Sequence, residues 1–145
     1  MVYIERDIKQ NLLSWKNDVN RKPLIIRGAR QIGKSWAVED FGKTCYEHLA
    51  VFNFDRKREL KDVFEKTKDP ERIIKELSYF TNVPLLPEKT LLFFDEIQEC
   101  KEALNALKYF CEDAPEYHIV AAGSLLGVAI NEGNYSFPVG KVNFM

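Results

Sequence analysis

Residues suited to cross-links or metal sites are scarce in this sequence of 145 residues, which contains three cysteines and two histidines. Cys45, Cys100 and Cys111 form no CxxC pair, so we expect buried, reduced thiols rather than a disulfide framework. His48 and His118 have no cysteine or histidine nearby at ligand spacing, which argues against a structural zinc site. A hydrophobic core must therefore hold the fold, and a chain of this length can bury one.

The sequence also lacks a long apolar run and an excess of charge of either sign. Its longest uncharged stretch, residues 119–131, is too short to span a bilayer. Charged residues near the N-terminus, such as Glu5 and Asp7, stand where a secretory signal needs an apolar run. The net charge of −1 excludes binding to nucleic acid or to an anionic membrane by bulk charge alone. We therefore expect a cytoplasmic protein without a membrane partner.

Helical and strand patterns alternate along the chain. Apolar residues at three- and four-residue spacing predict an opening amphipathic helix and four later ones, at residues 4–19, 33–43, 60–64, 70–80 and 103–111. Short, continuously apolar runs predict strands at residues 24–26, 48–54, 91–94, 119–122 and 137–144. Such strands are typical of a parallel sheet covered on both faces. The sequence thus predicts an α/β fold, with residues 1–22 forming a helix packed on a core of residues 23–145.

A glycine-rich segment between the first predicted strand and the next helix fits the phosphate-loop pattern G-x-x-x-x-G-K-[ST]. The residues are Gly28, Ala29, Arg30, Gln31, Ile32, Gly33, Lys34 and Ser35. The backbone N–H groups of such a loop, and the N-terminus of the helix behind it, surround a phosphate. We expect Lys34 to reach the β and γ phosphates and the Ser35 hydroxyl to ligate Mg²⁺. The next residue, Trp36, completes the set that we expect to contact the nucleotide.

A second candidate feature follows the apolar run at residues 91–94. Asp95 and Glu96 would lie at the carboxyl edge of a parallel sheet, where the phosphate loop also opens. Asp95 would hold Mg²⁺ through its water shell, and Glu96 would orient or deprotonate an attacking water. The alternative is that both acids are solvated and cap the following helix.

Two further segments leave two interpretations open. Ser124 follows the strand predicted at 119–122 and would either hold the attacking water near the γ phosphate or satisfy a turn. The basic residues Arg56, Lys57 and Arg58 alternate with acids, which favours a solvated helix surface over a nucleic-acid patch.

Three strings of the sequence together resemble the predicted AAA+ ATPases of bacteria and archaea, in which a domain of unknown function follows the ATPase module. The strings are the phosphate loop at 28–35, Phe94-Asp95-Glu96-Ile97-Gln98 and Ala122-Gly123-Ser124-Leu125-Leu126-Gly127. The resemblance implies a P-loop NTPase core of the AAA+ (ASCE) type with sheet order 5-1-4-3-2 flanked by helices. It also implies that Ser124 stands at the sensor-1 position.

The chain departs from that family in two places. The family often has a Gly-Arg pair where this sequence has Gly140-Lys141, and lysine lacks the bidentate fork of an arginine finger. AAA+ proteins also carry a helical lid after the core, and this sequence ends near the fifth strand. We therefore expect a truncated core that lacks its lid, binds ATP and ADP weakly and turns over slowly, and whose uncovered surface favours homo-oligomers.

These patterns predict an ATPase that binds ATP or ADP with Mg²⁺ and uses Lys34, Glu96 and Ser124 in catalysis. Hydrolysis would drive a conformational change in C-terminal parts that contact a protein partner or DNA. The alternatives are a nucleotide-gated switch with little turnover and a small-molecule kinase. The acid at position 96 and the absence of an arginine-rich insertion argue against the kinase.

Overall fold

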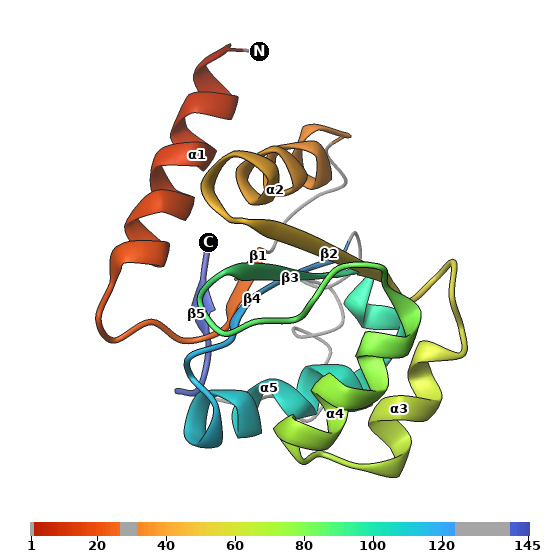
Figure 1. Cartoon of the computed structure of the whole chain (residues 1–145). Coiled ribbons are helices and arrows are strands. Elements are labelled where there is room, and N and C mark those ends of the chain that lie inside the picture. Colours follow the sequence, from red (N-terminus) through yellow and green to blue (C-terminus); the bar gives the residue numbers. More distant parts are fainter. Residues whose placement is uncertain (1, 27–31, 124–139) are drawn as a thin grey trace.

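The computed structural model of the chain describes residues 2–26, 32–123 and 140–145. Within these residues, helices and strands alternate as the sequence predicts (Figure 1). The helices are α1 (Val2–Asn17), α2 (Ile32–Cys45), α3 (Leu60–Lys66), α4 (Pro70–Leu77) and α5 (Lys101–Asp113), with short 3-10 turns η1 (Ser78–Phe80) and η2 (Ile97–Glu99). The strands are β1 (Leu24–Ile26), β2 (His48–Asn53), β3 (Thr90–Asp95), β4 (His118–Ala122) and β5 (Asn143–Phe144).

The strands of the described residues form one parallel sheet in the order β2-β3-β4-β1-β5. This is the order 5-1-4-3-2 read from the other edge, so the predicted P-loop topology is confirmed. All residues of the central strand β4 are buried, as are all of β3 except Asp95 at its end. Continuous burial is what a parallel strand covered on both faces requires.

Helices cover both faces of the sheet, with α1 and α2 on one side and α3, α4 and α5 on the other (Figure 1). The face under α3, α4 and α5 is rich in phenylalanine. Phe54, Phe64 and Phe94 contact one another edge to face, with ring centroids 5.6–5.8 Å apart. Such pairs add to the energy of apolar burial. The sequence-predicted cap is also present, because the Asp69 side chain accepts a hydrogen bond from the N–H of Arg72 at the start of α4.

The N-terminal helix α1 packs on the other face through Leu12 and Trp15, which are both buried. The helix ends at Asn17, two residues before the predicted end, and Val19 is 96% exposed. The side chain of Asp18 accepts a hydrogen bond from the N–H of Asn20 and forms a local turn there. No described helix has both the length and the apolar character needed to cross a membrane.

The strand at the end of the chain is shorter than predicted. Within residues 140–145 only Asn143–Phe144 pair with β1, and Gly140 adopts a positive φ of 77° in a turn. Asn143 is held by the backbone, since its side chain accepts from the N–H of Lys22. The rest of that predicted strand, residues 137–139, and the turn-like residues 131–136 lie outside the described residues.

Cysteine burial follows the prediction only in part. Cys100 is buried, whereas Cys45 and Cys111 are half-buried, and all three are free thiols. The basic segment Arg56, Lys57 and Arg58 is exposed, but it lies in the turns before α3 and not on a helix surface as predicted.

Candidate functional site

The carboxyl ends of four strands meet in one row across the sheet. Asn53 pairs with Asp95, Asp95 with Ala122, and Ala122 with Ile26. The phosphate-loop segment follows Ile26 at this edge of the sheet, and Glu96 follows Asp95. In open α/β sheets this edge is where ligands bind.

The phosphate-loop motif stands between β1 and α2, the strand–loop–helix context that its chemistry requires. Gly28, Ala29, Arg30 and Gln31 lie outside the described residues. Ile32, Gly33 and Lys34 form the first turn of α2. The start of α2 therefore lies at the carboxyl edge, where its N-terminal N–H groups and dipole favour an anion.

Ser35 and Asp95 meet at this edge although they are 60 residues apart in the chain. The Ser35 hydroxyl donates to the Asp95 carboxylate, with 3.4 Å between Oγ and Oδ2. A hydroxyl and a carboxylate are hard oxygen ligands of the kind that Mg²⁺ prefers. The described residues contain no cluster of three or more His, Cys, Asp or Glu side chains able to hold a metal. Mg²⁺ commonly binds through one or two protein ligands together with phosphates and water, so Ser35 and Asp95 fit that ion.

The electrostatics of Asp95 favour a cation. Burial raises the pKa of its carboxyl, and the charges of Glu96 and Glu39 raise it further. Hydrogen bonds from the N–H of Glu96 and from Ser35 act in the opposite direction. The shift means that the structure disfavours the negative charge of Asp95 unless a positive charge lies beside it.

Glu96 has an unusual backbone conformation, with φ 55° and ψ 43° in the left-handed region. Its N–H donates to Asp95 Oδ1 at 2.9 Å, and its own carboxylate accepts from Gln98 Nε2 at 2.6 Å. Glu96 occupies the N-cap position of η2, but no side chain forms a cap hydrogen bond there, and the N-cap residue of α5 is Cys100. The helix-capping alternative thus describes the position of Glu96 but no cap hydrogen bond of its side chain.

Beyond β4, Ser124 lies outside the described residues, but Gly123 before it is described. A Cβ atom at position 123 would lie 1.8 Å from Oε1 of Gln98, far inside any real contact. Gln98 and Gly123 were not among the predicted site residues. The only sequence signal for them is their place in the strings Phe94–Gln98 and Ala122–Gly127.

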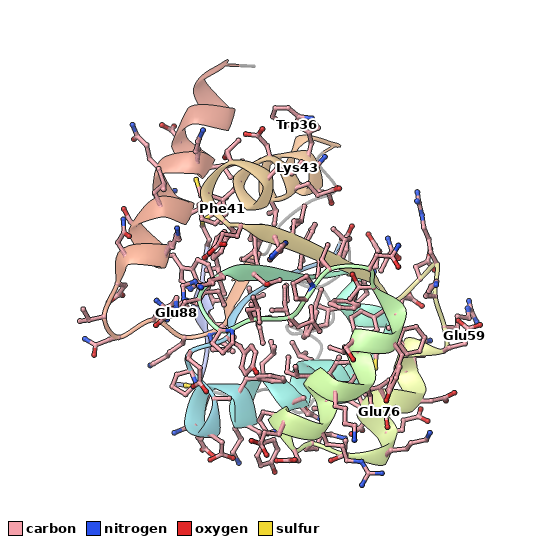
Figure 2. All side chains as sticks on the ribbon, in the orientation of Figure 1. Trp36, Phe41, Lys43, Glu59, Glu76 and Glu88 are labelled. Carbon is pink, nitrogen blue, oxygen red and sulfur yellow. The ribbon has the colours of Figure 1, made fainter. Side chains whose placement is uncertain are left out.

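Trp36, predicted to contact the nucleotide, is 57% exposed. Figure 2 shows it on the side of α2 that faces away from the sheet. Lys141 lies toward the opposite end of the sheet and forms an ion pair with Glu112, with 3.3 Å between Nζ and Oε1. The Gly140-Lys141 pair thus has its partner on α5 rather than at the carboxyl edge.

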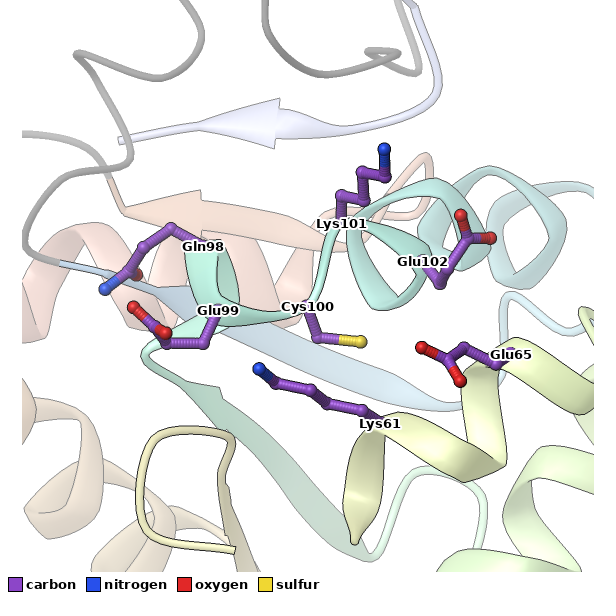
Figure 3. Close-up of a pocket in the computed structure, with 7 residues that line it drawn as sticks. All are labelled: Lys61, Glu65, Gln98, Glu99, Cys100, Lys101 and Glu102. Carbon is purple, nitrogen blue, oxygen red and sulfur yellow. The ribbon is translucent and has the colours of Figure 1, made fainter. Parts of the chain in front are cut away.

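A cavity of about 620 Å³ opens between α3 and the start of α5 (Figure 3). It is lined by Lys61 and Glu65 and by residues 98–102. No described residue predicted to bind nucleotide lines it. Burial raises the pKa of the Cys100 thiol in its wall, which keeps the sulfur protonated and weakly reactive at neutral pH.

A family described as an AAA domain matches residues 20–144 of the sequence. The chain belongs to this AAA-domain family. Nucleotide binding is the property expected of such a domain. No curated protein sequence matches the chain.

Solved structures with the same fold agree with this assignment. The Walker-type ATPase PABY2304 of Pyrococcus abyssi has 18% sequence identity and a TM-score of 0.51, over 97% of this chain and 51% of that one. The Orc1 protein of Aeropyrum pernix, solved in complex with DNA, has 13% identity and a TM-score of 0.52, over 97% of this chain and 43% of that one. The AAA-domain chain thus spans about half the length of these neighbours.

Proposed function

We propose that this AAA domain binds ATP and ADP with Mg²⁺ at the carboxyl edge of the sheet and hydrolyses ATP there. The observation that carries the proposal is the contact between Ser35 at the start of α2 and Asp95 at the end of β3. This contact brings Ser35, the last residue of the phosphate-loop motif, to Asp95, the acid that ends β3. Mg²⁺, when bound with the nucleotide, supplies positive charge that offsets the phosphate oxygens.

The residues of the site have distinct roles in binding and hydrolysis. The loop amides and Lys34 bind the phosphates, while Ser35 and Asp95 orient the metal. Glu96, the next residue after Asp95, accepts a proton from the attacking water. Ser124 is proposed to hold the same water. Water is the proposed acceptor of the γ phosphate, because Glu96 stands next to the proposed metal ligand Asp95 and the sequence has no arginine-rich insertion to cover another acceptor.

We further propose that nucleotide turnover drives a conformational change in other parts of a longer protein, through which a protein partner or DNA is engaged. Support comes from the length of the neighbours, about twice that of this chain, and from the DNA bound to the Orc1 protein. The net charge of −1 gives the domain itself no general attraction for DNA.

The substitution Glu96→Gln tests the hydrolytic step. Glutamine preserves the shape of the side chain, so Mg·ATP affinity should stay within threefold of wild type. However, glutamine cannot accept a proton from the attacking water. Hydrolysis should fall by about 100-fold or more, the usual contribution of a general base. Single-turnover phosphate release, with protein in excess over ATP, measures even slow hydrolysis.

Lys34→Ala supplies the background rate in the same assay. Adding hydroxylated small molecules should leave phosphate release unchanged and should form no phosphorylated product. A wild-type rate for Glu96→Gln would remove Glu96 from the reaction, and a phosphorylated acceptor would make the domain a kinase.

A further inference from the structure

The side chain of Gln98 contacts the residues that follow both central strands of the site. Gln98 lies in η2 and is 8% exposed. Its Nε2 donates to Glu96 Oε2 at 2.6 Å. In Figure 3 the side chain runs away from Cys100 and Lys101, although Gln98 also borders the cavity. The amide thus binds the carboxylate that the proposed function assigns to water activation.

The other end of the same amide lies against Gly123. A Cβ atom at position 123 would meet Oε1 of Gln98 at 1.8 Å and Cδ at 2.9 Å. The amide therefore occupies the space that any side chain at position 123 would need. Because Asp95 and Ala122 pair across β3 and β4, this contact joins the segments that follow these two strands.

The position of Gln98 is fixed by the hydrophobic core. Its neighbour Ile97 is fully buried in the cluster that includes Phe94 and Leu104. The N–H of Cys100 donates to the Ile97 carbonyl and closes the turn. A short, buried turn anchored in this way can hold a side chain in one orientation.

We infer that Gln98 is a positioning residue that orients the Glu96 carboxylate for water activation and is itself held against Gly123. The inference rests on the proposed function. A base that is oriented by a third group is a common arrangement in enzymes. One oxygen of Glu96 is fixed by Gln98, which leaves the other, Oε1, for the water. A shift of Gly123 would move the amide and, with it, the base.

The first test needs no turnover. In a ¹⁵N-labelled protein, the side-chain amide resonances of Gln98, assigned by their loss in Gln98→Met, should shift in Glu96→Gln. They should also shift in Gly123→Ala, because the added methyl group displaces the amide. Lys101→Ala, a change of an exposed side chain directed away from the site, should leave them in place. Gln98 resonances that respond to neither Glu96→Gln nor Gly123→Ala would overturn the inference.

The second test separates positioning from packing. Gln98→Met keeps the length of the side chain but cannot donate, so single-turnover hydrolysis should fall about 10- to 100-fold, as expected for loss of one hydrogen bond to a charged group. The ADP affinity and the KM for ATP should stay within threefold. Gln98→Glu retains the shape but places a carboxylate against Glu96, and should be at least as slow. A wild-type rate in Gln98→Met would overturn the inference.

Double variants show whether the residues act as one unit. In a Glu96→Gln background, Gln98→Met should cause no further loss, because the base is already absent. In a Gln98→Ala background the shorter side chain leaves room for a methyl group at position 123, so Gly123→Ala should have little added effect. Independent, multiplicative losses would contradict the coupling. If Glu96→Gln itself is fully active, the water-activating role that the proposed function gives to Glu96 fails; if Glu96→Gln is inactive but Gln98→Met is not impaired, the positioning role alone fails.

Discussion

At the scale of one residue, the surroundings of Asp95 would favour a bound cation. Its carboxylate is partly removed from water and lies near the charges of Glu96 and Glu39, which raises its pKa. A group whose charged form is disfavoured in the folded state reduces stability at neutral pH. A bound divalent cation would offset that cost. The Asp95 carboxylate would therefore lower the stability of the free protein but stabilise the complex with the cation.

Asp95→Asn should therefore have opposite effects on stability and on binding. Without ligand, the melting temperature at pH 7 should rise, because the buried negative charge is gone. The gain in ADP affinity on adding Mg²⁺ should fall by about 10- to 100-fold, since a contact with a charged group contributes about 1.5–3 kcal/mol.

Differential scanning calorimetry and nucleotide titrations with and without Mg²⁺ measure the two effects. Asp113→Asn, at an exposed position of α5, is the matched control and should change neither. An Asp95→Asn protein that keeps the full Mg²⁺ effect would exclude Asp95 as a metal ligand.

Among the elements, α2 sets the position of the site. Its Gly42 lies so close to the sheet that a Cβ atom there would be 2.5 Å from a methyl carbon of Leu49. The other end of the helix brings Ser35 to Asp95. The close approach at Gly42 and the contact at Ser35 together fix the helix over β2 and β3.

The helix α1 is attached to the same face through a buried histidine. His118, at the start of β4, contacts the ring of Trp15 edge to face, and its Nδ1 lies 2.6 Å from the Tyr46 hydroxyl. Its Nε2 has no hydrogen-bond partner among the described residues. Burial first, and then the charges of Arg21 and Lys16, lower the pKa of His118 to about 4.

This shift predicts a pH dependence of stability. The neutral imidazole is favoured in the folded state, so its full contribution is present above pH 6.5, the ordinary pKa of histidine. As the pH falls from 6.5 to about 4, the free energy of unfolding should decrease by up to about 3 kcal/mol. Urea unfolding at several pH values measures it.

The substitution His118→Gln removes the titrating group and should flatten the profile between pH 6.5 and 4. Tyr46→Phe, which removes the hydroxyl but leaves the imidazole, should keep most of the slope. Identical slopes for wild type and His118→Gln would mean that His118 does not control this range.

Much of the architecture follows from local sequence patterns, but its details do not. Apolar periodicity located α1, α5 and the buried strands β3 and β4, because a helix stripe or a continuous strand leaves a distinct pattern. It placed Val19 in α1 and predicted too long a final strand, because the turns at Asp18 and Gly140 depend on individual hydrogen bonds and dihedral angles.

For the whole molecule, the parallel topology explains why two of the predicted site residues, Ser35 and Asp95, could be placed together from sequence. Acids that end a strand and a loop that follows another strand must meet at one edge, so Asp95 could be placed near Ser35 in advance. The contact of Gln98 with Gly123 could not be predicted from sequence, because it depends on the register of β3 and β4 and on the left-handed backbone conformation of Glu96. The phosphate loop itself and Ser124 remain predictions.

Titration calorimetry of ADP with Mg²⁺ into wild-type protein and Lys34→Ala tests whether the carboxyl edge of this AAA domain is a nucleotide site. Lys34 should form more than one charge-assisted hydrogen bond to the phosphates, each contributing about 1.5–3 kcal/mol. The affinity of Lys34→Ala for ADP should be at least about 100-fold lower, with an unchanged circular dichroism spectrum. An affinity within threefold of wild type in the folded variant would contradict a nucleotide site at this edge.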